Sequence, residues 1–332
     1  MNINWKKTIT IVASAAVLLS VAACGSSTAS DAGDSGSKSG KKTVGFVAVG
    51  PEGGYRTANE NDIKAAFDKA GFDLVYAPTQ NNDQQKQIQA FNKFVNDEVD
   101  AIVLSSTEDS GWDDSLKKAA EAEIPVFTVD RHVEVKGAEA KKAVVAYIGP
   151  DHEWQGEQAA EYVNKNFPDG ANGIVLEGPA GLSVVKDRTK GFNAKIASNQ
   201  KILESQSANW STDEAKTVTA GLLDKYKSEN ISWIFAQNDE MGLGAAQAVD
   251  AAGMKGKVKI IAVDGTKAAL EAVAKGDLAF DIETNPLFGE ATAKAVEDHL
   301  AGKSVEENTI VESKTFDQAQ AQAALDSGER QY

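Results

Sequence analysis

The amino-acid sequence predicts an α/β fold with two similar lobes, each built around a parallel β-sheet. Short apolar segments rich in β-branched residues alternate with amphipathic segments of about a dozen residues, which is the pattern of repeated βα units. Several apolar segments have no polar face, as is typical of parallel strands covered by helices on both sides. The alternation starts again after residues 149–151, and this restart predicts the second lobe. With 332 residues, of which 42% are hydrophobic, the chain can bury two cores.

The predicted strand Val126–Val129 gives the first indication of a ligand site. It is β-branched or aromatic throughout and is followed at once by Asp130 and Arg131. Open α/β sheets bind their ligands at the carboxyl ends of their strands, so these two side chains stand where a ligand is expected. A local ion pair that only closes a loop is the alternative, because surface pairs of this kind are common and often inert. Polar residues also follow other strands, and this repetition favours the ligand site.

In the first half of the chain, glycines and the spacing of apolar residues mark the elements. Residues 50–54 (GPEGG) break the first strand, and Gly71 ends the first helix, whose apolar residues fall on one face. The predicted strands are Thr43–Val49, Phe72–Tyr76, Asp100–Ser105, Val126–Val129 and a short extended segment at Val144–Ile148, and the predicted helices are Thr57–Ala70, Asp83–Asn96 and Gly111–Ala122.

The second half follows the same alternation of strand and helix. No sequence identity between the halves is strong enough to call a repeat, so the predicted similarity is one of architecture. The predicted strands are Gly173–Leu176, Ile202–Ser205, Trp233–Ala236 and Lys259–Val263, and the predicted helices are Trp154–Asn166, Val184–Ala197, Thr212–Lys227, Gly242–Ala252 and Lys267–Lys275.

Residues 1–23 are predicted to be a lipoprotein signal peptide. Lys6 and Lys7 precede an apolar stretch, residues 9–21, that is too short to span a bilayer comfortably. The stretch ends in the letters VAAC, which resemble the lipobox of bacterial lipoproteins, in which cleavage precedes a cysteine that is then lipidated. Cys24 is the only cysteine, so an intrachain disulfide is impossible. An ordinary secretory peptide with a chance cysteine is the alternative.

Residues 24–41 are predicted to form a flexible tether, because they are mostly Ser, Gly, Ala and Asp with almost no apolar side chains. Such a tether would let a globular domain move above the membrane to which lipidated Cys24 holds it.

Composition and spacing argue against several classes of function. The formal net charge of -15 disfavours a nucleic-acid partner, since phosphates select basic surfaces. The three histidines, His132, His152 and His299, lack metal-ligand spacing, and no glycine-rich phosphate loop follows the first strand. We therefore expect no metal and no cofactor.

Four motifs, in this order and spacing, carry a resemblance to a known family. They are residues 124–131 (IPVFTVDR), 191–192 (GF), 237–241 (QNDEM) and 263–266 (VDGT). With them the chain resembles the sugar-binding proteins of bacterial ABC importers, in the ribose-binding-like group of type I periplasmic binding proteins. The similarity runs from about residue 43 to the C-terminus and is greatest to the fructose-import and galactofuranose-binding members.

The resemblance implies two Rossmann-like lobes joined by a three-segment hinge. The crossings are expected near residues 149–151, 284–285 and 313–315, so that helix Glu290–Leu300 returns to the first lobe. The implied N-terminal lobe is 42–149 plus 285–313, and the implied C-terminal lobe is 150–284 plus 314–332. Short paired crossings of this kind allow hinge closure around a ligand.

The resemblance also places ligand contacts, carried over position by position. In the implied site the arginines donate, the aspartates accept and two aromatic rings stack on opposite faces of a sugar, which suits hydroxyls and apolar C–H faces. The alternatives are a solvated charge for Arg188 and core packing for Tyr55 and Trp210; Trp154 is interpreted as packing. The implied contacts are Tyr55, Asp130, Arg131, Arg188, Trp210, Asn238 and Asp264, with Glu52 and Arg56 added because the loop at 52–56 resembles that of the galactofuranose type.

The expected function is therefore capture of a monosaccharide for an ABC permease and its ATPase. The ligand is expected to be a furanose, with fructose favoured over galactofuranose; Thr284, flanked by Glu283, replaces a ribose-type glutamine and leaves specificity open. The protein is expected to be a monomer, without enzyme activity, held to the outer face of the cell membrane by a palmitate-type lipid on Cys24. The alternatives are a sugar sensor for a membrane receptor and a glycosidase, the latter disfavoured because nearby arginines should keep the acids ionised.

Overall fold

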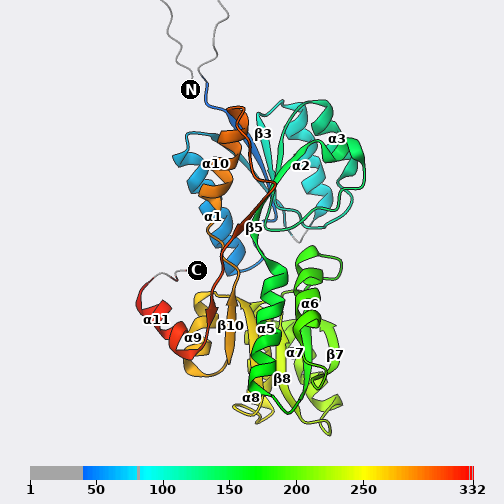
Figure 1. Cartoon of the computed structure of the whole chain (residues 1–332), viewed down its shortest axis with the longest axis vertical. Helices are drawn as coiled ribbons and strands as arrows, with labels where there is room; N and C mark the ends of the chain where they lie inside the picture. The colour runs from blue at the N-terminus through cyan, green and yellow to red at the C-terminus, as the bar shows by residue number, and fades with distance from the viewer. Residues whose placement is uncertain (1–39, 81–82, 329, 331) are drawn as a thin grey trace, which may run out of the picture. The chain divides into compact units, whose positions relative to one another are not determined.

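The computed structural model describes residues 40–80, 83–328, 330 and 332. The predicted signal peptide, Cys24 and most of the predicted tether lie outside these described residues. Residues 41–332 form one compact unit, and this unit contains two α/β lobes, each with a six-stranded sheet (Figure 1). The predicted fold class is thereby confirmed.

The first lobe has a sheet in the order β11-β5-β4-β3-β1-β2, in which all paired neighbours run parallel. Helices α1 and α10 pack on one face and α2 and α3 on the other (Figure 1). The strands are β1 (Thr43–Ala48), β2 (Asp73–Pro78), β3 (Ala101–Leu104), β4 (Val126–Val129), β5 (Val144–Pro150) and β11 (Asn308–Val311), and the helices are α1 (Gly54–Lys69), α2 (Gln84–Asn96), α3 (Asp113–Glu121), α4 (Ala138–Lys141) and α10 (Gly289–Leu300).

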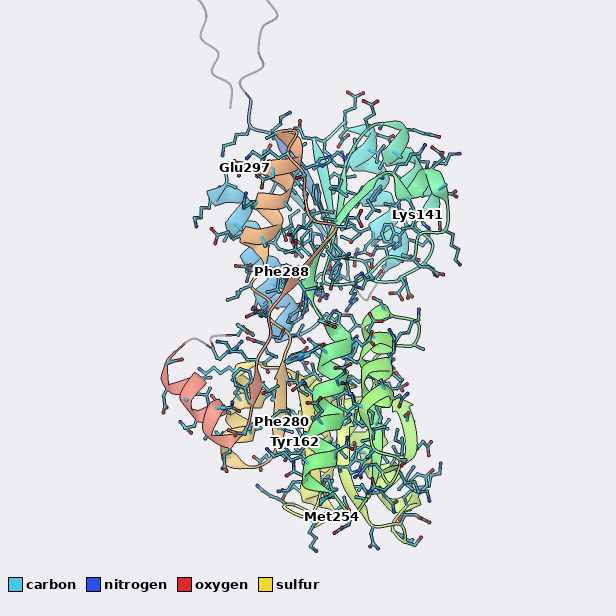
Figure 2. The ribbon with its side chains drawn as sticks, in the orientation of Figure 1. Lys141, Tyr162, Met254, Phe280, Phe288 and Glu297 are labelled. Atoms are coloured by element: carbon cyan, nitrogen blue, oxygen red, sulfur yellow. The ribbon has the colours of Figure 1, made fainter. Side chains whose placement is uncertain are left out.

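The second lobe has a sheet in the order β12-β10-β9-β8-β6-β7, parallel except for the antiparallel edge strand β12. Helices α5 and α6 cover one face, where Tyr162 stacks on Phe280 with ring centroids 4.7 Å apart (Figure 2), and α7, α8 and α9 cover the other. The strands are β6 (Asn172–Glu177), β7 (Lys201–Ser207), β8 (Ile231–Ala236), β9 (Lys259–Asp264), β10 (Phe280–Glu283) and β12 (Thr315–Phe316), and the helices are α5 (His152–Asn166), α6 (Ser183–Lys195), α7 (Thr212–Lys225), α8 (Asp239–Ala251), α9 (Lys267–Lys275) and α11 (Gln318–Asp326).

The chain passes between the two sheets three times. It leaves the first sheet after β5, returns to the first lobe after β10, and enters the second sheet again between β11 and β12. Helix α10 packs against α1 on its return, with Phe288 buried at its start (Figure 2). Because all strands except β12 run parallel within their sheets, their carboxyl ends gather at one edge of each lobe.

Helices α1 and α8 each begin three residues earlier than the sequence predicts, and both differences affect the site. Helix α1 begins at Gly54 rather than Thr57, because Gly53 adopts a φ of 139° that lets the chain turn straight into the helix. Helix α8 begins at Asp239 rather than Gly242, because Asn238 caps it by accepting a hydrogen bond from the backbone of Met241.

Five short or polar elements were not predicted: α4, β10, β11, β12 and α11. Strand β10 carries two acids among its four residues, so it lacks the apolar run that identifies the other strands. None of the helices in the described ranges combines the length and the apolar character of a membrane span.

Candidate functional site

One pocket between the lobes brings together all nine residues that the sequence analysis selected. The first-lobe residues of the pocket come from the turn before α1, the first turn of α1 and the end of β4. The second-lobe residues come from α6, the turn before α7 and the ends of β8 and β9. Those nine residues are Glu52, Tyr55, Arg56, Asp130, Arg131, Arg188, Trp210, Asn238 and Asp264.

Tyr55 and Arg56 lie in the first turn of α1, which corrects their predicted place in a loop. Both side chains turn towards Asp130: the Tyr55 hydroxyl donates to Oδ1 over 2.7 Å, and Arg56 Nη2 donates to Oδ2 over 2.5 Å. Asp130 follows β4 with a φ of 65°, a left-handed conformation that Asp tolerates better than most residues. The first-lobe wall is thus centred on one buried carboxylate.

Arg131 and Glu52 form a second pair on the same wall. Arg131 Nη2 lies 2.5 Å from Glu52 Oε2, and Arg131 Nη1 donates to the carbonyl of Ser106 over 3.2 Å. Arg56, His152 and Arg131 lower the pKa of Asp130 far below its usual value, although burial alone would raise it. Asp130 is therefore ionised across the physiological range.

Arg188 dominates the second-lobe wall, and it is buried rather than a solvated charge. Its Nε donates to Gln155 Oε1 over 2.8 Å, Nη2 donates to Thr284 Oγ1 over 2.8 Å, and Nη1 donates to the carbonyl of Gln237. With a further bond of 3.4 Å from Nη2 to Asp264 Oδ1, the protein uses the Nε donor, both donors of Nη2 and one donor of Nη1. The predicted fork towards a ligand is thus reduced to one N–H of Nη1.

Asp264 lies at the end of β9 and differs from Asp130 in the direction of its pKa shift. Its Oδ1 accepts from Thr284 Oγ1 over 2.8 Å and lies 3.4 Å from Arg188 Nη2. Burial outweighs Arg188 and, together with Glu240, raises the pKa of Asp264. The lowered pKa of Asp130 agrees with the expectation that nearby arginines keep the site acids ionised, whereas the raised pKa of Asp264 runs against it, because one guanidinium does not offset burial.

Asn238 serves both the helix and the pocket. Its Oδ1 caps α8, and its Nδ2 donates to Glu240 Oε2 over 2.6 Å. Burial raises the pKa of Glu240. One N–H of Asn238 remains for another partner.

Several buried polar atoms around the pocket have no hydrogen-bond partner within the described part of the chain. Unpaired buried polar groups are uncommon in proteins and need an explanation. Donors and acceptors of this kind, on residues that line one pocket, match a ligand that carries hydroxyl groups. The atoms are Glu52 Oε1, Arg56 Nε, Arg131 Nε and Trp210 Nε1.

The pocket also contains five residues that the sequence analysis did not select as contacts: Gly53, His152, Val184, Glu240 and Thr284. Gly53 and Glu240 lie inside the segments 52–56 and 237–241, which contain predicted site residues. Thr284 enters the sequence analysis only as the residue that replaces a ribose-type glutamine. His152 was considered only for metal binding, although its position just after the first crossing was a usable signal.

His152 connects the lobes next to the hinge. Its Nε2 lies 2.8 Å from the carbonyl oxygen of Asp130, and its Nδ1 lies 3.0 Å from Gln155 Oε1. Burial and Arg188 lower the pKa of His152 to about 4. The ring is therefore neutral at neutral pH and donates from one nitrogen only.

The remaining histidines and Trp154 do not line the pocket. His132 stacks on Tyr147, His299 packs edge-on against Phe127, and Trp154 packs on the core of the second lobe as predicted. Among the residues that the structure describes, no three His, Cys, Asp or Glu side chains are arranged to hold a metal ion.

Comparison with known proteins places this pocket in a family context. A family model described as a periplasmic binding protein domain matches residues 44–304. The fructose import binding protein FruE of Bifidobacterium longum is 76% identical over 329 residues, which cover 99% of both chains. The galactofuranose-binding protein YtfQ of Escherichia coli is 32% identical over 280 residues, covering 82% of this chain and 87% of that protein.

Solved structures agree in fold over most of this chain. A Mycobacterium smegmatis protein in complex with β-D-fucofuranose has a TM-score of 0.81 at 36% identity, covering 87% of this chain and 95% of that one. The arabinose-transporter binding protein of Shewanella sp. ANA-3, bound to L-arabinofuranose, has a TM-score of 0.82 at 32% identity and covers 86% and 95%. By sequence and by structure, the chain belongs to the periplasmic binding protein family.

Proposed function

We propose that this protein is the solute-binding component of an ABC sugar importer and that it captures a monosaccharide in furanose form, with fructose favoured over galactofuranose. The observation that carries the proposal is the pocket between the lobes, where charged hydrogen-bonding groups and two aromatic rings converge. The names of the relatives support it, because they include fructose import and galactofuranose binding.

The charge balance of the pocket favours a neutral ligand. Its wall contains three guanidinium groups and four carboxyl groups, and most of these are paired with one another. A phosphate or carboxylate ligand would need a surplus of unpaired positive charge, which this wall does not offer. Hydroxyl groups can donate to the carboxylates and accept from the guanidiniums without disturbing the balance.

Tyr55 and Trp210 supply the apolar part of the site, one from each lobe. Both rings are buried, and each has a guanidinium near its face: Arg56 at 5.3 Å from the Tyr55 ring centroid and Arg188 at 5.8 Å from that of Trp210. We propose that these rings contact opposite C–H faces of the sugar. A furanose suits this site because it is flat and carries an exocyclic arm for Glu52 and Arg56 to hold.

We further propose that residues 42–149 with 285–313 move as one lobe and residues 150–284 with 314–332 as the other. Closure on the sugar would present one shape to a membrane permease, whose ATPase then drives import. In this proposal the protein acts as a monomer and has no nucleic-acid partner.

Attachment to the outer face of the cell membrane is proposed through a lipid on Cys24 after removal of residues 1–23. Changing Cys24 to Ala is expected to release the protein from the membrane fraction. Incorporation of labelled fatty acid into the variant would contradict the lipid anchor.

A glycosidase is the second candidate, because the pKa values of Asp130 and Asp264 are shifted in opposite directions, as in an acid–base pair. We favour binding without turnover, since the acids are engaged with arginines and a threonine of the protein. Incubation with fructosides and other disaccharides should yield no products. Hydrolysis that disappears in Asp264→Asn would move the protein to the enzyme class.

A further inference from the structure

Two helices that border the pocket begin without a cap from their own sequence. Helix α1 starts after Gly53 and helix α6 after Leu182; neither of these residues gives a side-chain cap, and neither helix has an acid in its first turn. A helix leaves its first N–H groups without intrahelical partners, and its N-terminus attracts negative charge. These two ends therefore need partners from elsewhere.

Most other helices of the described residues supply their own caps. In each of these, the side chain directly before the helix accepts a hydrogen bond from the first turn. The caps are Asp83 for α2, Asp151 for α5, Ser211 for α7, Asn238 for α8, Thr266 for α9 and Asp317 for α11.

The partners of α1 and α6 come from the opposite lobe. Asp109, in the first lobe after β3, accepts from the first backbone N–H of α6, that of Ser183, over 2.6 Å. Its other oxygen accepts from Lys186 over 2.8 Å. In the reverse direction, Glu240 of α8 in the second lobe accepts from the first backbone N–H of α1, that of Gly54, over 3.3 Å.

We propose that Asp109 and Glu240 form a reciprocal latch, in which each lobe caps a helix of the other and thereby holds the closed state. When the lobes separate, both helix ends lose their carboxylate partners and return to water. The latch thus contributes to the closed state and not to the fold of either lobe.

The two halves of the latch have different relations to the ligand. Asp109 does not line the pocket, whereas Glu240 does and also accepts from Asn238. Asp109 is therefore the better residue to test the latch alone. Glu240 links the latch to the ligand site, because it accepts from Asn238, a proposed ligand contact.

Asp62 provides a matched control. It accepts over 2.6 Å from the backbone N–H of Gly289, the first residue of α10, whose N-cap Phe288 also gives no side-chain cap. This cap is chemically the same, but Asp62 and Gly289 both belong to the first lobe. Its loss should affect the fold and leave closure unchanged.

The test compares Asp109→Ala, Asp62→Ala and the unchanged chain by stopped-flow dissociation of fructose and by thermal unfolding without sugar. The dissociation measurement rests on the proposed function. If the unchanged chain fails to bind fructose, that result contradicts the proposed function alone. Dissociation is then measured with whichever monosaccharide the chain does bind. For Asp109→Ala we expect dissociation about fivefold faster, the usual effect of losing one cap, with an unchanged unfolding temperature. For Asp62→Ala we expect the opposite: a lower unfolding temperature and unchanged dissociation.

Two results would overturn the latch. One is a dissociation rate for Asp109→Ala within twofold of the unchanged chain. The other is a fall in the unfolding temperature of unliganded Asp109→Ala as large as that of Asp62→Ala, which would make Asp109 part of the fold of its own lobe. Lys186→Ala should accelerate dissociation less than Asp109→Ala, because the Lys186 side chain is mostly exposed.

Discussion

The two walls of the pocket use similar residue types, but the pKa of the buried aspartate is lowered on one wall and raised on the other. On the first-lobe wall, Asp130 is surrounded by two arginines and a tyrosine hydroxyl, and its pKa is lowered. On the second-lobe wall, Asp264 has one arginine, and its pKa is raised. The number of cations around each buried acid accounts for the difference. Asp130 thus gives the first-lobe wall a fixed negative charge, whereas Asp264 gives the second-lobe wall a group that titrates.

Two further acids of the second lobe, which do not line the pocket, also have raised pKa values. Asp239 and Asp281 are both fully buried, and burial together with neighbouring acids raises the pKa of each. Asp239 accepts from the backbone of Thr266 over 2.7 Å, next to the turn that follows Asp264. The pKa is thus raised both for Asp264 on the pocket wall and for these two buried acids.

The largest expected effect comes from removing the fixed charge of the first wall. Asp130→Asn keeps a side chain that tolerates the left-handed backbone but leaves Arg56 and Arg131 without their shared carboxylate. We expect sugar affinity to fall about thirtyfold or more, corresponding to about 2 kcal/mol for a stranded buried partner. Isothermal titration calorimetry measures this, with Asp298→Asn, which breaks an ion pair on α10, as the control. Unchanged affinity in Asp130→Asn would remove Asp130 from the ligand site.

Asp264→Asn sharpens the comparison, because an amide resembles the protonated acid. At pH 8.5 we expect an affinity loss of about tenfold, as for a lost hydrogen bond to a charged group. At pH 5.5 the loss should be smaller, because the raised pKa leaves much of the native Asp264 protonated there. The ratio of native to variant affinity should therefore increase with pH. A ratio that does not change between these two pH values would contradict the assignment of the titratable group to the second wall.

Much of this architecture follows from the sequence, because buried parallel strands leave a strong apolar signal. The pocket residues could be selected for the same reason: Asp130, Asn238 and Asp264 come directly after strands whose carboxyl ends meet at one edge of a sheet. Strand β10 could not be predicted, since Asp281 and Glu283 interrupt its apolar pattern, and β12 is only two residues long.

The caps of α1 and α6 were beyond sequence analysis for a different reason. Their partners, Glu240 and Asp109, are distant in sequence and are brought to these helix ends only by the contact between the lobes. The pKa of Asp264 likewise depends on the three-dimensional count of neighbouring charges, which spacing along the chain does not give.

The smallest expected effect concerns stability rather than binding. Burial raises the pKa of Asp281 from 3.8 to about 7, so its stabilising contribution is fully present below about pH 4 and is lost as pH rises through about 7. The unfolding temperature of the unliganded chain should therefore fall over this range, and Asp281→Asn should reduce the fall. Differential scanning calorimetry between pH 5 and pH 8 tests this, with Asp250→Asn, an exposed acid on α8, as the control. Equal pH dependence in both variants would contradict the account.

Calorimetry with fructose and with ribose, followed by a crystal structure of the complex, tests the central claim most directly. We expect fructose to bind more tightly than ribose, because fructofuranose carries two hydroxymethyl arms and ribofuranose only one, and a site built to hydrogen-bond the second arm discriminates against a ligand that lacks it. In the crystal, fructose should lie as a furanose between Tyr55 and Trp210, with Asp130 and Asp264 on its hydroxyl groups. Tighter binding of ribose, or a pyranose ring in the pocket, would contradict the proposed ligand.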